Sequence, residues 1–227
     1  MQSFYSQFAG HFGAVSRSGL TAIGTASALA GLSELVYMMH ENQLMLVDFV
    51  LFSFVIAAHL SASYVAAMAM LSAPMSIGSY FRFLRGSAFL WGALVMGVVL
   101  FLIAPQGANR DAFLTNGIIL ALIGLLVLMM LPALPIAEAL HQRIRPWALL
   151  KATKGHRFAL VGLFMASGSL DKLVPNLSIV SGFLTIAGVL VCNFIINAAT
   201  NLFYTALAVT SWQFAATGLG QSVAGDR

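Results

Sequence analysis

Three amide side chains recur at every fourth position near the end of the chain and form its clearest polar pattern. Asn193, Asn197 and Asn201 lie within an apolar run, and Thr205 continues the series. A spacing of four places side chains on one face of a helix. In lipid such a face would leave donors and acceptors unsatisfied, so it must point into protein or water. It is either a helix-packing stripe or the lining of a polar path or small-molecule pocket.

Two ionisable residues also lie inside apolar runs. Glu34 lies about two turns from the end of the first run, and His59 lies near the middle of the second. Ionisable groups in lipid are costly, so each is a functional candidate that needs a partner. Either the two meet across a helix pair and form a proton-sensitive site, or each hydrogen-bonds a neighbouring helix. Glu138, by contrast, lies at the end of a run and can reach the interface.

A second polar group is basic and lies between two apolar runs. Its members are Arg143, Arg145, Lys151, Lys154 and Arg157, interleaved with Ile144, Trp147, Leu149 and Leu150. This alternation predicts an amphipathic helix lying flat at the membrane surface, with its cations toward anionic lipid headgroups and Trp147 at the interface. The alternative is an ordinary basic loop.

The motifs of common catalytic sites do not occur in the sequence. It contains no Gly-rich phosphate loop, no His-Glu-x-x-His and no Gly-x-Ser-x-Gly. The single cysteine, Cys192, excludes an internal disulfide and a cysteine-rich metal site. We therefore expect no enzymatic activity, no cofactor and no metal.

Composition indicates the solvent around these groups. Of 227 residues, 60% are hydrophobic and 8% are charged, whereas soluble domains carry about 25% charged residues. Lipid must therefore surround most of the chain. The formal net charge is +4, but the cations lie in short segments between apolar runs. That distribution encodes membrane topology, and it does not indicate nucleic acid as a partner.

The apolar runs predict an all-α bundle of six transmembrane spans in a single domain over residues 1–227. The spans cover approximately residues 18–39, 45–71, 88–104, 117–140, 158–170 and 179–209. With this threading, nine of the eleven Lys and Arg residues fall on one side of the membrane, and only Arg110 and Lys172 fall on the other. The asymmetry predicts that both termini lie on the cytoplasmic side.

A weak internal repeat accompanies the spans. Arg82-Phe-Leu-Arg85-Gly86 followed by Phe89 is similar to Lys151-Ala-Thr-Lys154-Gly155 followed by Phe158. The chain is either three repeated hairpin units, each beginning with a cytoplasmic amphipathic segment, or a bundle whose basic residues recur for topological reasons alone. The first span is rich in Ala and Gly, which predicts tight packing against another helix.

The basic segment and its neighbours also carry a family resemblance. Pro132-Ala-Leu-Pro135 is followed by Trp147-Ala-Leu-Leu-Lys151-Ala-Thr-Lys154-Gly155-His156-Arg157-Phe158. This pattern resembles bacterial YciC-like membrane proteins and the membrane domain attached to glycerophosphodiester phosphodiesterases. It covers about residues 131–163 and departs from the family at Ala152, where Ser is usual, and at Phe158, where Trp is common. The resemblance implies a six-span, multi-pass protein of the bacterial inner membrane without an assigned activity.

Taken together, the sequence predicts a non-catalytic integral membrane protein, either an accessory or structural subunit of a membrane assembly or an envelope-maintenance protein. Its expected partners are the lipid bilayer, anionic headgroups and other membrane subunits or further copies of itself. The alternative is a small transporter or channel whose polar path is lined by Asn193, Asn197 and Asn201, with Glu34 and His59. A lipid-modifying enzyme would need a cluster of polar groups at one interface, which the sequence does not show.

Overall fold

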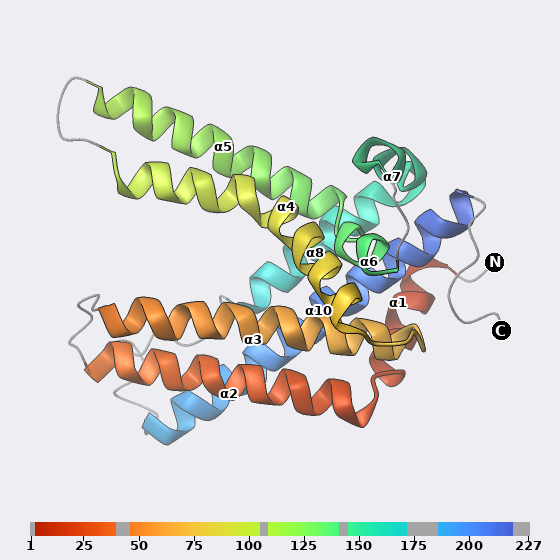
Figure 1. Ribbon diagram of the computed structural model, residues 1–227, viewed down its shortest axis with the longest axis horizontal. Coiled ribbons are helices and arrows are strands. Elements are labelled where there is room, and N and C mark those ends of the chain that lie inside the picture. Colours follow the sequence, from red (N-terminus) through yellow and green to blue (C-terminus); the bar gives the residue numbers. More distant parts are fainter. Residues whose placement is uncertain (1–2, 40–45, 105–108, 141–144, 172–185, 220–227) are drawn as a thin grey trace. The chain divides into compact units, whose positions relative to one another are not determined.

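The computed structural model describes residues 3–39, 46–104, 109–140, 145–171 and 186–219, and all regular structure in these ranges is helical (Figure 1). The helices are α1 (Phe4–Gly13), α2 (Arg17–Met39), α3 (Leu46–Met70), α4 (Ile77–Leu102), α5 (Arg110–Met130), α6 (Leu134–Ala139), α7 (Pro146–Ala152), the 3-10 turn η1 (Lys154–His156), α8 (Arg157–Asp171) and α10 (Ile186–Gly218).

Four of these helices are long and apolar enough to cross a membrane. They are α2, α3, α5 and α10. A fifth span results if the two parts of α4, Ile77–Gly92 and Leu94–Leu102, form one span with a bend of 49°. The prediction of an all-helical chain with helices suited to cross a membrane is therefore confirmed for the described residues. The count of six spans, the cytoplasmic termini and the repeated hairpins stay predictions.

The predicted fifth span corresponds to α8, which the structure describes only as Arg157–Asp171. Fifteen residues of helix extend roughly 22 Å, less than the hydrocarbon core of about 30 Å. The described part of α8 is therefore too short to cross the membrane upright.

Two helices depart from the expected span boundaries for local reasons. The helix of the third span begins at Ile77, well before residue 88, because Ser76 and Ser79 form a capping box there. The helix of the fourth span ends at Met130 and not near residue 140, because Pro132 follows and a short helix, α6, starts with Pro135 in its first turn. The cations Arg82 and Arg85 consequently lie on a helix.

The chain forms two compact units. The first consists of α1, α2, α3, α8 from Gly162 onward and α10 as far as Thr210. The second consists of α4 to α7, η1, the start of α8 up to Val161, and α10 from Ser211.

In the first unit, α2 and α3 lie side by side and antiparallel (Figure 1). Their core contains Ile23 and Ala26 from α2 and Ala62 and Ala66 from α3, with Ala198 and Leu202 of α10 packed against it. A methyl group at Gly19 would lie 3.2 Å from the Cα of Ala66. The expected tight packing of the first span is therefore confirmed, and small residues make it possible.

In the second unit, α4 and α5 lie side by side (Figure 1), and they approach most closely at glycines. A Cβ atom at Gly97 would lie 2.5 Å from the backbone nitrogen of Ala121 and 2.6 Å from the carbonyl oxygen of Gly117. Nearer the N-terminal end of α4, a Cβ atom at Gly86 would lie 2.7 Å from the Cα of Pro135 in α6. Both contacts require the absence of a side chain.

Candidate functional site

Asn193, the first member of the amide series, connects α10 to α2 by a hydrogen bond. Its side chain is fully buried, and its Nδ2 donates a hydrogen bond to Oε2 of Glu34 at 2.5 Å. The intramembrane carboxylate therefore has a partner on a neighbouring helix. The Oδ1 of Asn193 is also buried, and no donor among the described residues reaches it.

Asn201 connects α10 to α3 by two hydrogen bonds. Its Oδ1 accepts a hydrogen bond from Oγ of Ser63 at 3.3 Å, and its Nδ2 donates to the backbone oxygen of His59 at 3.4 Å. Both distances are near the long end of the hydrogen-bond range. On α10 itself, the hydroxyl of Thr205 donates to the backbone oxygen of Asn201 at 2.8 Å. Asn201 thus contacts α3 through both ends of its amide.

Asn197 and the His59 ring have their hydrogen bonds within their own helices. Nδ2 of Asn197 donates to the backbone oxygen of Asn193 at 2.9 Å. The His59 Nδ1 lies 2.9 Å from the backbone oxygen of Val55. Asn197 is half-buried. Sequence reasoning grouped Asn197 with the other asparagines by its spacing, and His59 with Glu34 by its depth in an apolar run. The structure separates both side chains from the two asparagines that bridge helices.

The structure does not bring Glu34 and His59 together as a proton-sensitive pair. Glu34 meets α10 at Asn193, whereas the His59 backbone meets it at Asn201. These two positions on α10 lie roughly 12 Å apart along the helix axis. Glu34 thus has its hydrogen bond with a neighbouring helix, as the second alternative expected, whereas the His59 ring bonds within α3 and only the His59 backbone oxygen meets α10.

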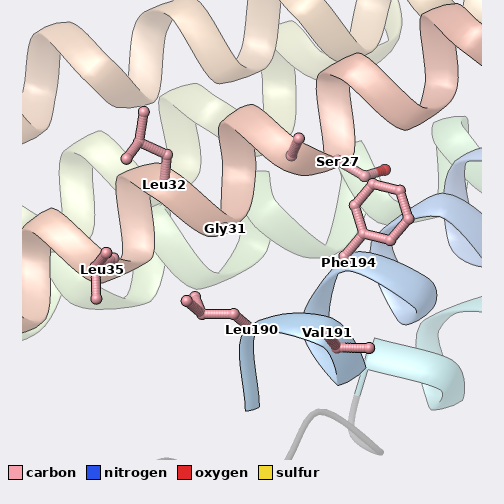
Figure 2. A pocket seen from close by; sticks show the side chains of 8 residues that line it. Ser27, Gly31, Leu32, Leu35, Leu190, Val191 and Phe194 are labelled. Atoms are coloured by element: carbon pink, nitrogen blue, oxygen red, sulfur yellow. The ribbon is translucent and has the colours of Figure 1, made fainter. Parts of the chain in front are cut away.

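A groove runs between α2 and α10 beside the Glu34–Asn193 hydrogen bond, and we call it the α2–α10 groove. Its volume is about 330 Å³ and its walls are almost entirely apolar. Figure 2 shows Ser27, Gly31 and Leu35 along α2, with Leu190 and Phe194 of α10 reaching toward them and Leu32 pointing away from α10. It is lined by Ser27, Ala28, Gly31, Leu32, Leu35, Leu190, Val191 and Phe194.

The basic segment forms a short helix, α7, within the second unit. Arg143 lies outside the described residues, and Arg145 precedes the helix as its N-cap. Leu149 is fully buried, whereas Trp147 is 75% exposed. Because the side of α7 that carries Leu149 is buried against protein, Trp147 is the most exposed apolar side chain of this helix. Sequence reasoning assigned both residues to the same membrane-facing side.

The cations of this segment differ in what they contact. Lys151 and Lys154 are exposed. Arg157 is half-buried, and its guanidinium donates a hydrogen bond to the backbone oxygen of Leu150 at 2.7 Å, near the C-terminal end of α7. Cations are favourable at that end of a helix because its carbonyl groups carry partial negative charge. Arg157 therefore holds α7 in place, and the two lysines are open to solvent or headgroups.

Two features of the second unit escaped sequence reasoning. Arg85 of α4 forms an ion pair with Glu138 of α6. Both residues were predicted at the same side of the membrane, so their pairing had a signal in the topology. Phe158, which was noted only as part of a motif, is 96% exposed at the start of α8. Nothing in the sequence distinguished it from the buried phenylalanines.

The described residues contain no group of three or more His, Cys, Asp or Glu side chains that could hold a metal ion. The chemistry available at the amide face is therefore hydrogen bonding between helices, together with one carboxylate. Comparison with known proteins found no matching family model, no matching curated protein and no matching solved structure.

Proposed function

We propose that this chain is a non-catalytic integral membrane protein that serves as an accessory or structural subunit of a membrane assembly. The observation that carries the proposal is that buried asparagines of α10 form hydrogen bonds to neighbouring helices. Asn193 and Asn201, the two members of the amide series with deeply buried side chains, contact Glu34 on α2 and Ser63 on α3. Their polar atoms serve helix packing, as structural side chains in a membrane bundle do.

The outer surfaces of the helices support the same proposal. Large apolar side chains are exposed on several sides of the first half of α3, and Phe49, Phe52 and Ile56 are among them. The spacing of these three residues places them on one helix face, and α5 exposes a similar face at Ile119, Leu122 and Leu126. Faces of this kind contact lipid or the helices of another subunit.

The test is the composition of the particle in its native membrane. The tagged chain would be extracted together with surrounding lipid into polymer-bounded discs, and its mass and stoichiometry would be measured. A particle with a second subunit, or a second copy, in fixed ratio is expected. Phe52→Ala with Ile56→Ala should weaken an assembly formed through α3, and Leu122→Ala on α5 is the matched control. A strictly monomeric particle would contradict the proposal.

A small transporter or channel is the second candidate, and one observation favours it. The buried Oδ1 of Asn193 has no donor among the described residues, and an unpaired acceptor of this kind is a place for water or a permeating donor. Proteoliposomes containing the wild type, Asn197→Leu or His59→Ala would be compared for ion and solute flux. Flux in the wild type that either variant reduces would favour transport over the structural role.

We place the protein in the bacterial inner membrane, with α7 toward anionic headgroups on the cytoplasmic side. Exposed Lys151 and Lys154, the exposed Trp147 ring and the exposed Phe158 ring support this placement. Fluorescence quenching of Trp147 by brominated lipids tests it, with Trp91→Phe and Trp212→Phe introduced to isolate the signal. Absence of quenching would contradict an interfacial position for α7.

A further inference from the structure

The α2–α10 groove has the length of one leaflet of a bilayer. Along α2 its lining runs from Ser27 to Leu35, which is roughly 12 Å of helix. Half of a hydrocarbon core of about 30 Å is about 15 Å. The candidate span of α2 ends at Tyr37, so we infer that the end of the groove at Leu35 lies close to the headgroups. Its shape therefore fits a single acyl chain entering from that interface.

Apolar walls alone do not select a ligand in a membrane. A chain in the groove exchanges one apolar environment for another, so the hydrophobic effect gives little preference for being there. Selection has to come from a polar contact. The candidate is Glu34, which lies one helical turn before Tyr37, roughly 5 Å below the end of the span.

Glu34 lies next to the lining of the groove without belonging to it. Glu34 is only half-buried, and no Lys or Arg among the described residues pairs with it. Its neighbours Gly31 and Leu35 on α2 line the groove, as do Leu190 and Phe194 beside Asn193 on α10. The hydrogen bond from Asn193 occupies one carboxylate oxygen. A carboxylate accepts several hydrogen bonds, so the Glu34 carboxylate can accept further hydrogen bonds from a ligand.

Asn193 is fully buried behind the groove lining and positions the Glu34 side chain. Its Oδ1 is buried and has no donor among the described residues, although its Nδ2 is used by Glu34. The Glu34 carboxylate thus presents negative charge and acceptor capacity next to the groove, and the apolar walls provide no charged donor. A ligand that complements it carries a positive charge with N–H donors above an acyl chain.

We propose that the α2–α10 groove binds a phospholipid whose headgroup carries a primary ammonium, with the ammonium on Glu34 and one acyl chain between α2 and α10. A quaternary ammonium has the same charge but no N–H donor, so it should bind less well. An anionic headgroup without an amine is repelled by the carboxylate. The proposal goes beyond a structural role, since packing of the amide face requires no particular lipid.

The experiment is a competition among lipids for the full-length protein in mild detergent. Phosphatidylethanolamine, phosphatidylcholine and phosphatidylglycerol with identical acyl chains would be added in equal amounts, and bound lipid would be counted by native mass spectrometry. The wild type should retain phosphatidylethanolamine over phosphatidylcholine roughly fivefold, since an exposed ion pair contributes up to about 1 kcal/mol. Free ethanolamine at the same concentration should not displace the lipid, because it lacks the chain.

Two variants separate the carboxylate from the groove. Glu34→Gln keeps an oxygen that accepts from Asn193, so the bundle stays intact while the preference for phosphatidylethanolamine falls to about onefold. Gly31→Leu places a branched side chain in the groove, where a Cβ atom would lie 4.0 Å from Leu190, and should reduce retention of all three lipids. Asp111→Asn and Gly162→Leu are the matched controls, since Asp111 is exposed on α5 and a Cβ atom at Gly162 meets nothing within 4 Å.

Retention of phosphatidylethanolamine that is unchanged in Glu34→Gln would overturn the proposal. So would equal retention of the three lipids by the wild type. A dimer that excludes lipid, and that Gly31→Leu dissociates, would show instead that a helix of a second copy fills the groove. Size-exclusion profiles that match the wild type establish that each variant is folded.

Discussion

The two units of this protein hold their helices together by different means. In the first unit, α2, α3 and α10 combine small residues with amide hydrogen bonds, such as that from Asn193 to Glu34. In the second unit, α4 meets α5 and α6 at Gly97 and Gly86, where backbones are in direct contact, and an ion pair joins the exposed Arg85 to the half-buried Glu138. Lipid does not drive apolar helices together, so close packing and hydrogen bonds must do so. The comparison indicates that the second unit depends mainly on close packing, and the first on both.

The sharpest way to break the second unit is to add a side chain at Gly97. In Gly97→Leu the new Cβ atom would lie 2.5 Å from the Ala121 backbone nitrogen, and a backbone cannot move away as a flexible side chain can. We expect α4 and α5 to separate at a cost of about 3 kcal/mol or more. The change in the free energy of unfolding would be measured by a titration in mixed micelles with increasing sodium dodecyl sulfate. Gly92→Leu is the control, because a Cβ atom there meets nothing within 4 Å.

Gly86→Ala tests the contact between α4 and α6. Its methyl group would lie 2.7 Å from the Cα of Pro135 and 3.2 Å from the carbonyl oxygen of Leu134. We expect a loss of about 2 kcal/mol in the same titration, since α6 has to shift away from α4. Gly78→Ala should be close to neutral, because its nearest neighbour is the flexible end of Arg82 at 3.6 Å. Equal effects of the two substitutions would contradict the contact.

In the first unit the largest effect should come from Asn193→Leu. The substitution removes the only hydrogen bond that Glu34 makes among the described residues, and membrane hydrogen bonds of this kind contribute roughly 0.6 to 2 kcal/mol. We expect a loss of about 1 to 2 kcal/mol. Asn197→Leu should cost less, since its hydrogen bond stays within α10. If Asn197→Leu proved the more damaging substitution, the assignment of helix-bridging roles would be wrong.

The smallest effect should follow Glu138→Gln. Its partner Arg85 has a side chain 66% exposed, whereas that of Glu138 is 19% exposed. Pairs of this kind contribute about 0 to 1 kcal/mol and weaken with salt. The stability difference from the wild type should therefore shrink between low and high ionic strength. A loss that exceeds that of Gly86→Ala would show that charge, and not close packing, holds α4 and α6 together.

The sequence alone predicted the class of the protein and much of its helical pattern. Long apolar runs in a chain with 8% charged residues can satisfy their backbone groups in lipid only as helices, and α2 and α3 follow the expected ranges closely. A spacing of four also placed the asparagines on one face of α10. These features are local, because they depend on residue type and helical period.

The tertiary structure decided which of these polar residues meet and where the helices touch. Asn193 hydrogen-bonds Glu34 and Asn201 hydrogen-bonds Ser63, whereas Asn197, with the same spacing, donates its hydrogen bond within its own helix. The crossing at Gly97 and the groove beside Glu34 depend on the angle and offset between helices. Those quantities arise from many weak packing contacts between segments distant in the chain, so no local pattern of residues specifies them.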